Sequence, residues 1–238
     1  MAVPADAGRP DPGGSGPPAH GRSVVVWDLP VRIVHWGLVI CLAGSWWTAE
    51  NEEWERHLQF GYAALGLVLF RLVWGVVGSE TARFRSFVRG PAAMLEHVRE
   101  MARKGPLPAH PGHNPVGAVA VVVLLALVLV QGVTGLFLSG GDIFVVEAPL
   151  NGWVGTRATS RLGSVHDWGF TLLQGMVALH VAAVLAYWLV KRRNLIGPML
   201  SGRVADLHGP APALAPILRA VVLGGIVAAA IWALVRFA

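Results

Sequence analysis

The sequence predicts an all-α integral membrane protein, built as a four-helix transmembrane bundle with a fifth, C-terminal transmembrane helix. Two features of the sequence predict this fold, its composition and the length of its apolar stretches. Only 14% of the 238 residues are charged, whereas 54% are hydrophobic and the mean hydropathy is +0.56. Soluble domains carry roughly 25% charged residues. In addition, the chain contains five apolar stretches, each close to the roughly 20 residues that a helix needs to cross a bilayer.

The apolar stretches predict where the helices lie. A membrane strand needs only about ten residues, so segments this long are better read as helices. Pro30 suits a first helical turn, which indicates that the first helix begins slightly before its apolar stretch. The fourth helix should likewise begin a residue or two before Trp168. The stretches are residues 31–48, 58–77, 116–138, 168–190 and 217–235.

The remaining segments divide the chain. Residues 1–23 are rich in Pro, Gly and Ala and read as a disordered tail. They lack the apolar core and cleavage site of a secretory signal peptide, so we expect no removal. Residues 24–203 form the predicted four-helix domain, and 204–238 a linker and the fifth helix. Within the domain, residues 91–103 predict an amphipathic surface helix, and residues 139–165 a long outer loop.

The basic residues predict the orientation. If the N-terminus is cytoplasmic, all but four of the nineteen lysines and arginines fall on that side. This distribution follows the positive-inside rule. The ten tryptophans fall near the two predicted interfaces, as in an aromatic belt. The high pI near 10.3 therefore reflects contact with membrane lipid, and we expect no nucleic-acid partner. The four exceptions are Arg56, Arg157, Arg161 and Arg236.

Cysteine usage limits the possible cofactors. The single cysteine, Cys41, lies inside an apolar stretch. One thiol excludes an internal disulfide, a cysteine-rich zinc or iron–sulfur site and the Cys-x-x-Cys-His attachment of a c-type haem.

Four of the nine histidines fall at membrane depth. Ionisable residues there are costly and usually functional. His166 and His180 are 14 residues apart on one predicted helix, so they share a face about 21 Å apart along the axis. His57 matches the depth of His166, and His35 approximately matches that of His180. The five histidines assigned to the tail, the loops or the surface helix are His20, His97, His110, His113 and His208.

Two facing imidazoles suit a six-coordinate haem iron, which serves electron transfer. The sequence therefore predicts two b-type haems, an outer one between His57 and His166 and an inner one between His35 and His180. The alternative is that these histidines join helices by hydrogen bonds or line a proton or metal pathway. We favour the haem interpretation because four histidines at matched depths are harder to explain as isolated structural contacts.

Arg71 is a further candidate, near the inner end of the second predicted helix. Its guanidinium is placed to pair with the carboxylates of an inner haem. The alternative is an anchor whose charged head reaches the cytoplasmic interface. The sequence leaves both open, and Arg32 has the same ambiguity.

Four segments resemble the prokaryotic cytochrome b561 family, which includes the cytochrome b subunits of nickel–iron hydrogenases. The resemblance covers about residues 24–203. It implies a four-helix bundle with two haems b and carries ligand roles onto His35, His57, His166 and His180. It also implies a bacterial inner membrane location. The segments are residues 27–36 (WDLPVRIVHW), 57–78 (HLQFGYAALGLVLFRLVWGVVG), 112–118 (GHNPVGA) and 166–193 (HDWGFTLLQGMVALHVAAVLAYWLVKRR).

The resemblance further implies electron exchange with membrane quinone at one end and with a redox partner at the other. The leading hypothesis is an electron-transfer subunit that links the quinone pool to an extracytoplasmic c-type cytochrome or hydrogenase. A second is a stand-alone quinone-linked oxidoreductase, for example on superoxide. A third is a haem-free membrane scaffold or transporter.

Overall fold

The computed structural model describes residues 23–88, 90–102, 115–141, 145–205 and 210–238. It confirms the predicted all-helical membrane architecture, with five helices long and apolar enough to span a bilayer. Several predicted features lie outside the described residues. They are residues 1–22 of the tail, residues 112–114 of the GHNPVGA segment, and His20, His110, His113 and His208. The five helices are α1 (Leu29–Glu50), α2 (Trp54–Val77), α5 (Pro115–Gly135), α6 (Thr156–Leu189) and α8 (Ile217–Phe237).

Helix α1 starts at a defined cap. Asp28 accepts a hydrogen bond from the backbone N–H of Val31 at 2.9 Å, which satisfies one of the free donors of the first turn. Pro30 stands within that turn, where its missing N–H carries no penalty. The helix therefore begins two residues before the apolar stretch, as Pro30 predicted. A short turn after Glu50 leads directly into α2.

Helix α6 is much longer than its apolar stretch. It runs for 34 residues from Thr156, so the C-terminal part of the predicted loop 139–165 is helical, and the prediction of a loop there was wrong. At 1.5 Å per residue the helix is about 51 Å long, against about 30 Å of hydrocarbon. The first turns contain Arg157 and Arg161 and carry no apolar signal. Hydropathy therefore detected only the membrane part of the helix.

Short elements close the two ends of the bundle. The predicted surface helix 91–103 is present as α4. At the same end the first and fourth strands pair in antiparallel fashion, with Val24 opposite Val204. At the other end the second and third strands form a small antiparallel ribbon. These elements are β1 (Val24–Val25), η1 (Glu80–Ala82), α3 (Phe84–Phe87), α4 (Pro91–Ala102), β2 (Ser139–Gly140), β3 (Val146–Glu147), α7 (Ile196–Ser201) and β4 (Arg203–Val204).

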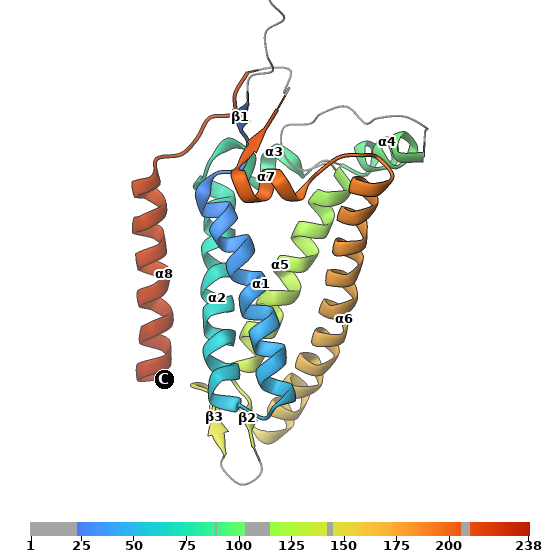
Figure 1. Ribbon diagram of the computed structural model, residues 1–238. Coiled ribbons are helices and arrows are strands. Elements are labelled where there is room, and N and C mark those ends of the chain that lie inside the picture. The colour runs from blue at the N-terminus through green and yellow to red at the C-terminus, as the bar shows by residue number, and fades with distance from the viewer. Residues whose placement is uncertain (1–22, 89, 103–114, 142–144, 206–209) are drawn as a thin grey trace, which may run out of the picture.

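The helices pack in sequence around the bundle. Helix α1 packs against α2, α2 against α5, and α5 against α6. In contrast, α1 and α6 make little direct contact over the described residues. Figure 1 shows these two helices diverging toward α7, whereas nearer the end that carries β2 and β3 the rings of Trp46 on α1 and Phe170 on α6 lie 6.4 Å apart. The side of the bundle between α1 and α6 is therefore its least tightly packed side.

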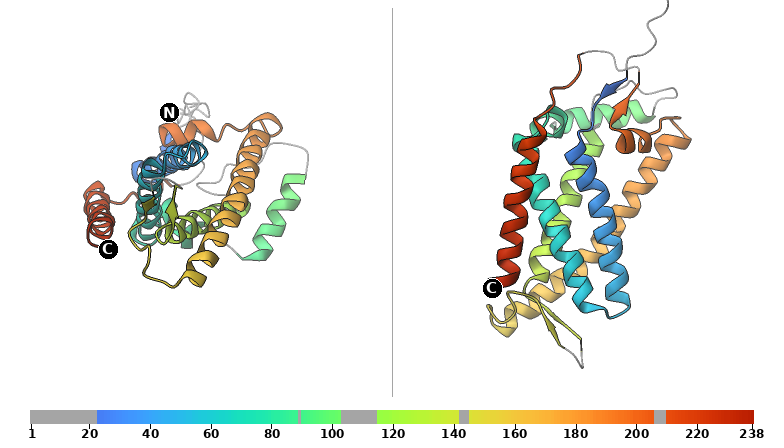
Figure 2. Two further views of the ribbon diagram at one scale, coloured as in Figure 1. Left: turned by 90° about the horizontal axis from the view of Figure 1, so that it is seen from below. Right: turned by 60° about the vertical axis from the view of Figure 1, so that its left-hand side comes forward.

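Helix α8 lies outside the four-helix bundle and packs against α2 (Figure 2). Its start is attached to the end of α2, because Arg219 Nη1 donates to the carbonyl of Val77 at 2.7 Å. The preceding segment is held by the loop after α2, where the N–H of Ala215 donates to Ser79 Oγ at 2.9 Å. Most of the large side chains of α8 are exposed. These contacts agree with a peripheral packing helix.

Candidate functional site

The structure brings His57 and His166 together near the β2–β3 end of the bundle. His57 stands in the first turn of α2 and His166 in the third turn of α6. Their ring centroids are 6.3 Å apart, and the ring planes are 71° apart. The two rings therefore face each other across the interior of the bundle, as matched depth predicted.

The ring of His57 is held by α1. Its Nδ1 lies 2.9 Å from the carbonyl oxygen of Ser45 and 3.2 Å from Ser45 Oγ. A carbonyl only accepts hydrogen bonds, so Nδ1 is the donor and the neutral ring keeps its lone pair on Nε2. Trp54 lies alongside, with a centroid distance of 6.1 Å. The contact leaves Nε2 of His57 available as a ligand.

The ring of His166 is held by α5. Its Nδ1 lies 3.0 Å from the hydroxyl oxygen of Thr134. Gly135 allows this close approach, because a Cβ at that position would lie 3.2 Å from Cε1 of the ring. Such spacing is tighter than an ordinary van der Waals contact. Both rings of this pair are thus oriented by neighbouring helices through Nδ1.

His35 on α1 and His180 on α6 are the second pair that the sequence predicts. They lie close enough for their charges to interact. The Nδ1 atom of His35 is buried and has no hydrogen-bond partner among the described residues. Trp36 stands edge-on to the ring at 4.9 Å between centroids. Helices α1 and α6 diverge toward the end of the bundle that carries α7 (Figure 1).

Arg71 is buried, with only 4% of its surface exposed. Its guanidinium carbon lies 5.0 Å from the centroid of the Phe84 ring, a cation–π contact. The carboxylate of Asp28 interacts with it electrostatically, yet the two form no ion pair. Nη1 is buried without a hydrogen-bond partner among the described residues. An anchor that reaches for water would expose its head, so this burial disfavours the anchor alternative.

Sequence reasoning missed the partners that orient these side chains. Ser45, Thr134 and Asp28 were not recognised as functional. Asp28 also accepts a hydrogen bond from Trp74 Nε1 at 2.9 Å, and it is 6% exposed. The motif DLP at the start of a helix signals the cap role of Asp28, but not its proximity to Arg71. No signal in the sequence identifies the acceptors of the two histidine rings.

The residues of the outer pair fit a haem. If two imidazoles bind opposite faces of one iron through metal–nitrogen bonds of about 2 Å, their centroids lie about 6 Å apart. The observed separation of 6.3 Å agrees with that requirement. At the inner end, the unpaired Nη1 of buried Arg71 suits a propionate carboxylate, because a buried guanidinium without an anion is unfavourable.

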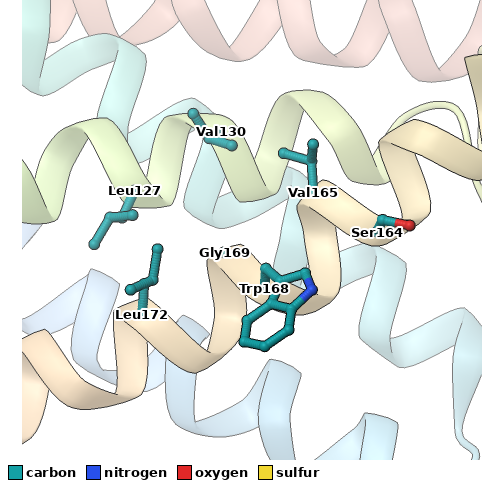
Figure 3. Close-up of a pocket in the computed structure, with 7 residues that line it drawn as sticks. All are labelled: Leu127, Val130, Ser164, Val165, Trp168, Gly169 and Leu172. Carbon is teal, nitrogen blue, oxygen red and sulfur yellow. The ribbon is translucent and has the colours of Figure 1, made fainter.

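A shallow apolar hollow lies between α5 and α6 (Figure 3). Its volume is about 300 Å³. Val165, Trp168 and Leu172 line it from α6, and Leu127 and Val130 from α5. It presents no charged group and no histidine, so it is distinct from the paired rings.

Fold and site together define a helical membrane protein whose bundle interior carries paired histidines. A family model described as prokaryotic cytochrome b561 matches residues 26–202, about three quarters of the chain. The chain belongs to this family and is a membrane b-type cytochrome that functions in electron transfer. The matched region contains all four candidate histidines and Arg71. Searches of curated proteins and of solved structures found no match.

Proposed function

We propose that this cytochrome holds two haems b and transfers electrons between the quinone pool and an extracytoplasmic redox partner, such as a c-type cytochrome or hydrogenase. His57 and His166 would ligate the outer haem, and His35 and His180 the inner one. A bound haem supplies one-electron chemistry, and six-coordination leaves no open position on the iron for a substrate. The protein would span the bacterial inner membrane with its N-terminus in the cytoplasm.

The 6.3 Å separation of the outer imidazoles is the observation that carries this proposal. Both outer rings also use Nδ1 for hydrogen bonds, which reserves Nε2 for a metal. Among the described residues, no group of three or more metal-binding side chains gathers. The histidines thus occur in pairs. This suits a haem, because the porphyrin supplies four nitrogens to the iron and leaves two axial positions for protein ligands. The haem-free alternative does not fit a b-type cytochrome.

The direct test is the haem content of the purified protein. We expect about two haems b per chain by pyridine haemochrome assay, and two components in a potentiometric titration of the α-band. A single haem per chain, with one titrating component under conditions that load haem fully, would contradict the two-haem proposal.

The role of the partner is tested by turnover. Reduced quinone should transfer electrons rapidly only when an extracytoplasmic carrier, such as a c-type cytochrome, is supplied. Rapid turnover by the purified cytochrome alone with a small soluble oxidant or reductant, such as superoxide, would favour the stand-alone oxidoreductase.

The proposed orientation predicts the location of inserted reporters. A reporter placed between residues 83 and 104 should be cytoplasmic, and one placed between residues 142 and 161 extracytoplasmic. The reason is the excess of Lys and Arg at the end with α3, α4 and α7. Reporter activity that depends on compartment measures this in intact cells. Reversed labelling would overturn the orientation and exchange the inner and outer sides.

A further inference from the structure

Thr134 occupies a position in which its hydroxyl contacts both its own helix and a proposed haem ligand. It is 5% exposed, and its Oγ1 lies 2.7 Å from the carbonyl oxygen of Val130 and 3.2 Å from that of Gln131. The same Oγ1 lies 3.0 Å from Nδ1 of His166. The sequence alone assigns no role to Thr134, since a single threonine is common in an apolar helix.

The direction of this hydrogen bond follows from counting hydrogens. A hydroxyl has one hydrogen, and a carbonyl oxygen only accepts. Oγ1 therefore donates to the carbonyl of Val130, the common pattern for Thr in a helix. Its remaining lone pair accepts from Nδ1 of His166. In the neutral ring this leaves Nε2 unprotonated, which is the form that binds a metal.

The two proposed haem sites differ in this respect. At the outer site His57 donates to the carbonyl of Ser45 and His166 to Thr134. At the inner site Nδ1 of His35 is buried without an acceptor among the described residues. A hydrogen bond donated by the second ring nitrogen makes an imidazole a stronger electron donor to the metal. Stronger donation favours the oxidised iron and lowers the midpoint potential.

We infer that Thr134 is a positioning residue that holds His166 with Nε2 free for the iron, and that these hydrogen bonds make the outer haem the lower-potential haem of the two. This inference rests on the proposed function, since it requires His166 to be an outer-haem ligand. It adds to that function an explanation of why the two haems would differ in midpoint potential, based on hydrogen bonds within the protein.

Valine at position 134 keeps the shape of threonine but removes the hydroxyl acceptor, so that of the two groups near the ring only the backbone of Gln131 remains. In T134V we expect the midpoint potential of the outer haem to rise, with the inner haem unchanged. At a fixed applied potential, the reduced-to-oxidised ratio of the outer haem should increase about threefold to tenfold, and tenfold corresponds to about 59 mV. T134S keeps the hydroxyl and should match the parent protein. Potentiometric titration measures the potentials, and electron paramagnetic resonance of the oxidised outer haem reports the changed ligand field.

A matched control is T171V on α6. The hydroxyl of Thr171 donates to the carbonyl of Asp167 in its own helix at 3.3 Å, and the described residues show no hydrogen bond from it to a histidine. This variant should leave both potentials unchanged. Loss of the outer haem in T134V with retention in T134S would also support the inference, because T134S keeps the hydroxyl although it fills the site less well than valine does.

Two results would overturn the inference. One is an unchanged outer potential and spectrum in T134V with full haem content. The other is equal loss of the outer haem in T134V and T134S, which would indicate packing alone. Failure of the proposed function is distinct: H166A would then keep its outer haem.

Discussion

Replacing His57 or His166 with alanine should remove the outer haem and leave the inner haem in place. An alanine supplies no lone pair, so the iron would lose one of its two protein ligands. H35A and H180A should do the converse. Each purified variant is expected to hold about one haem b per chain and to show one component of the parent's two in a redox titration. These are the largest effects that we expect of any single substitution.

A control separates ligand loss from disturbance of the helix. Thr171 is exposed and lies on α6 between the two proposed ligands. T171A should therefore retain both haems. Loss of a haem in H57A with its retention in H166A would break the proposed pairing, because both side chains are assigned to one iron. Retention of both haems in all four variants would remove the histidines from the site.

Replacing Arg71 with glutamine should lower the midpoint potential of the inner haem and leave the outer one nearly unchanged. A fixed positive charge near a haem favours the reduced iron, which carries one fewer positive charge. For charges about 8 Å apart in an effective dielectric of about 20, Coulomb's law gives roughly 2 kcal/mol. For one electron this corresponds to about 90 mV before screening reduces it. Burial of Arg71 limits that screening, since 4% of the side chain is exposed.

The matched control keeps the charge. R71K should stay close to the parent potential, although lysine loses the planar fork that binds a carboxylate at two points. Potentiometric titration of both variants at one salt concentration measures the effect. A shift of only a few millivolts in R71Q, with normal insertion, would contradict an interaction with the inner haem. A shift confined to the outer haem would contradict the assignment of the two ends.

Regularities within single helices were predictable from the sequence. The length of apolar runs revealed five spans because hydrocarbon thickness sets how many residues a helix needs. The fixed pitch of a helix placed His166 and His180 on one face before any packing was known. The same signal failed for α6, whose polar first turns from Thr156 lie outside the apolar run.

The relations between helices were decided by tertiary structure. Matched depth predicted that His57 faces His166, but only packing set the 6.3 Å between their rings. Whether Arg71 reaches water or stays buried depends on the position of Phe84, which belongs to α3, the short helix that follows α2. The acceptors Ser45 and Thr134 belong to other helices than the rings they hold. Sequence alone determines the residues and the pitch of each helix, whereas the rotation and shift of one helix against another arise from side-chain packing.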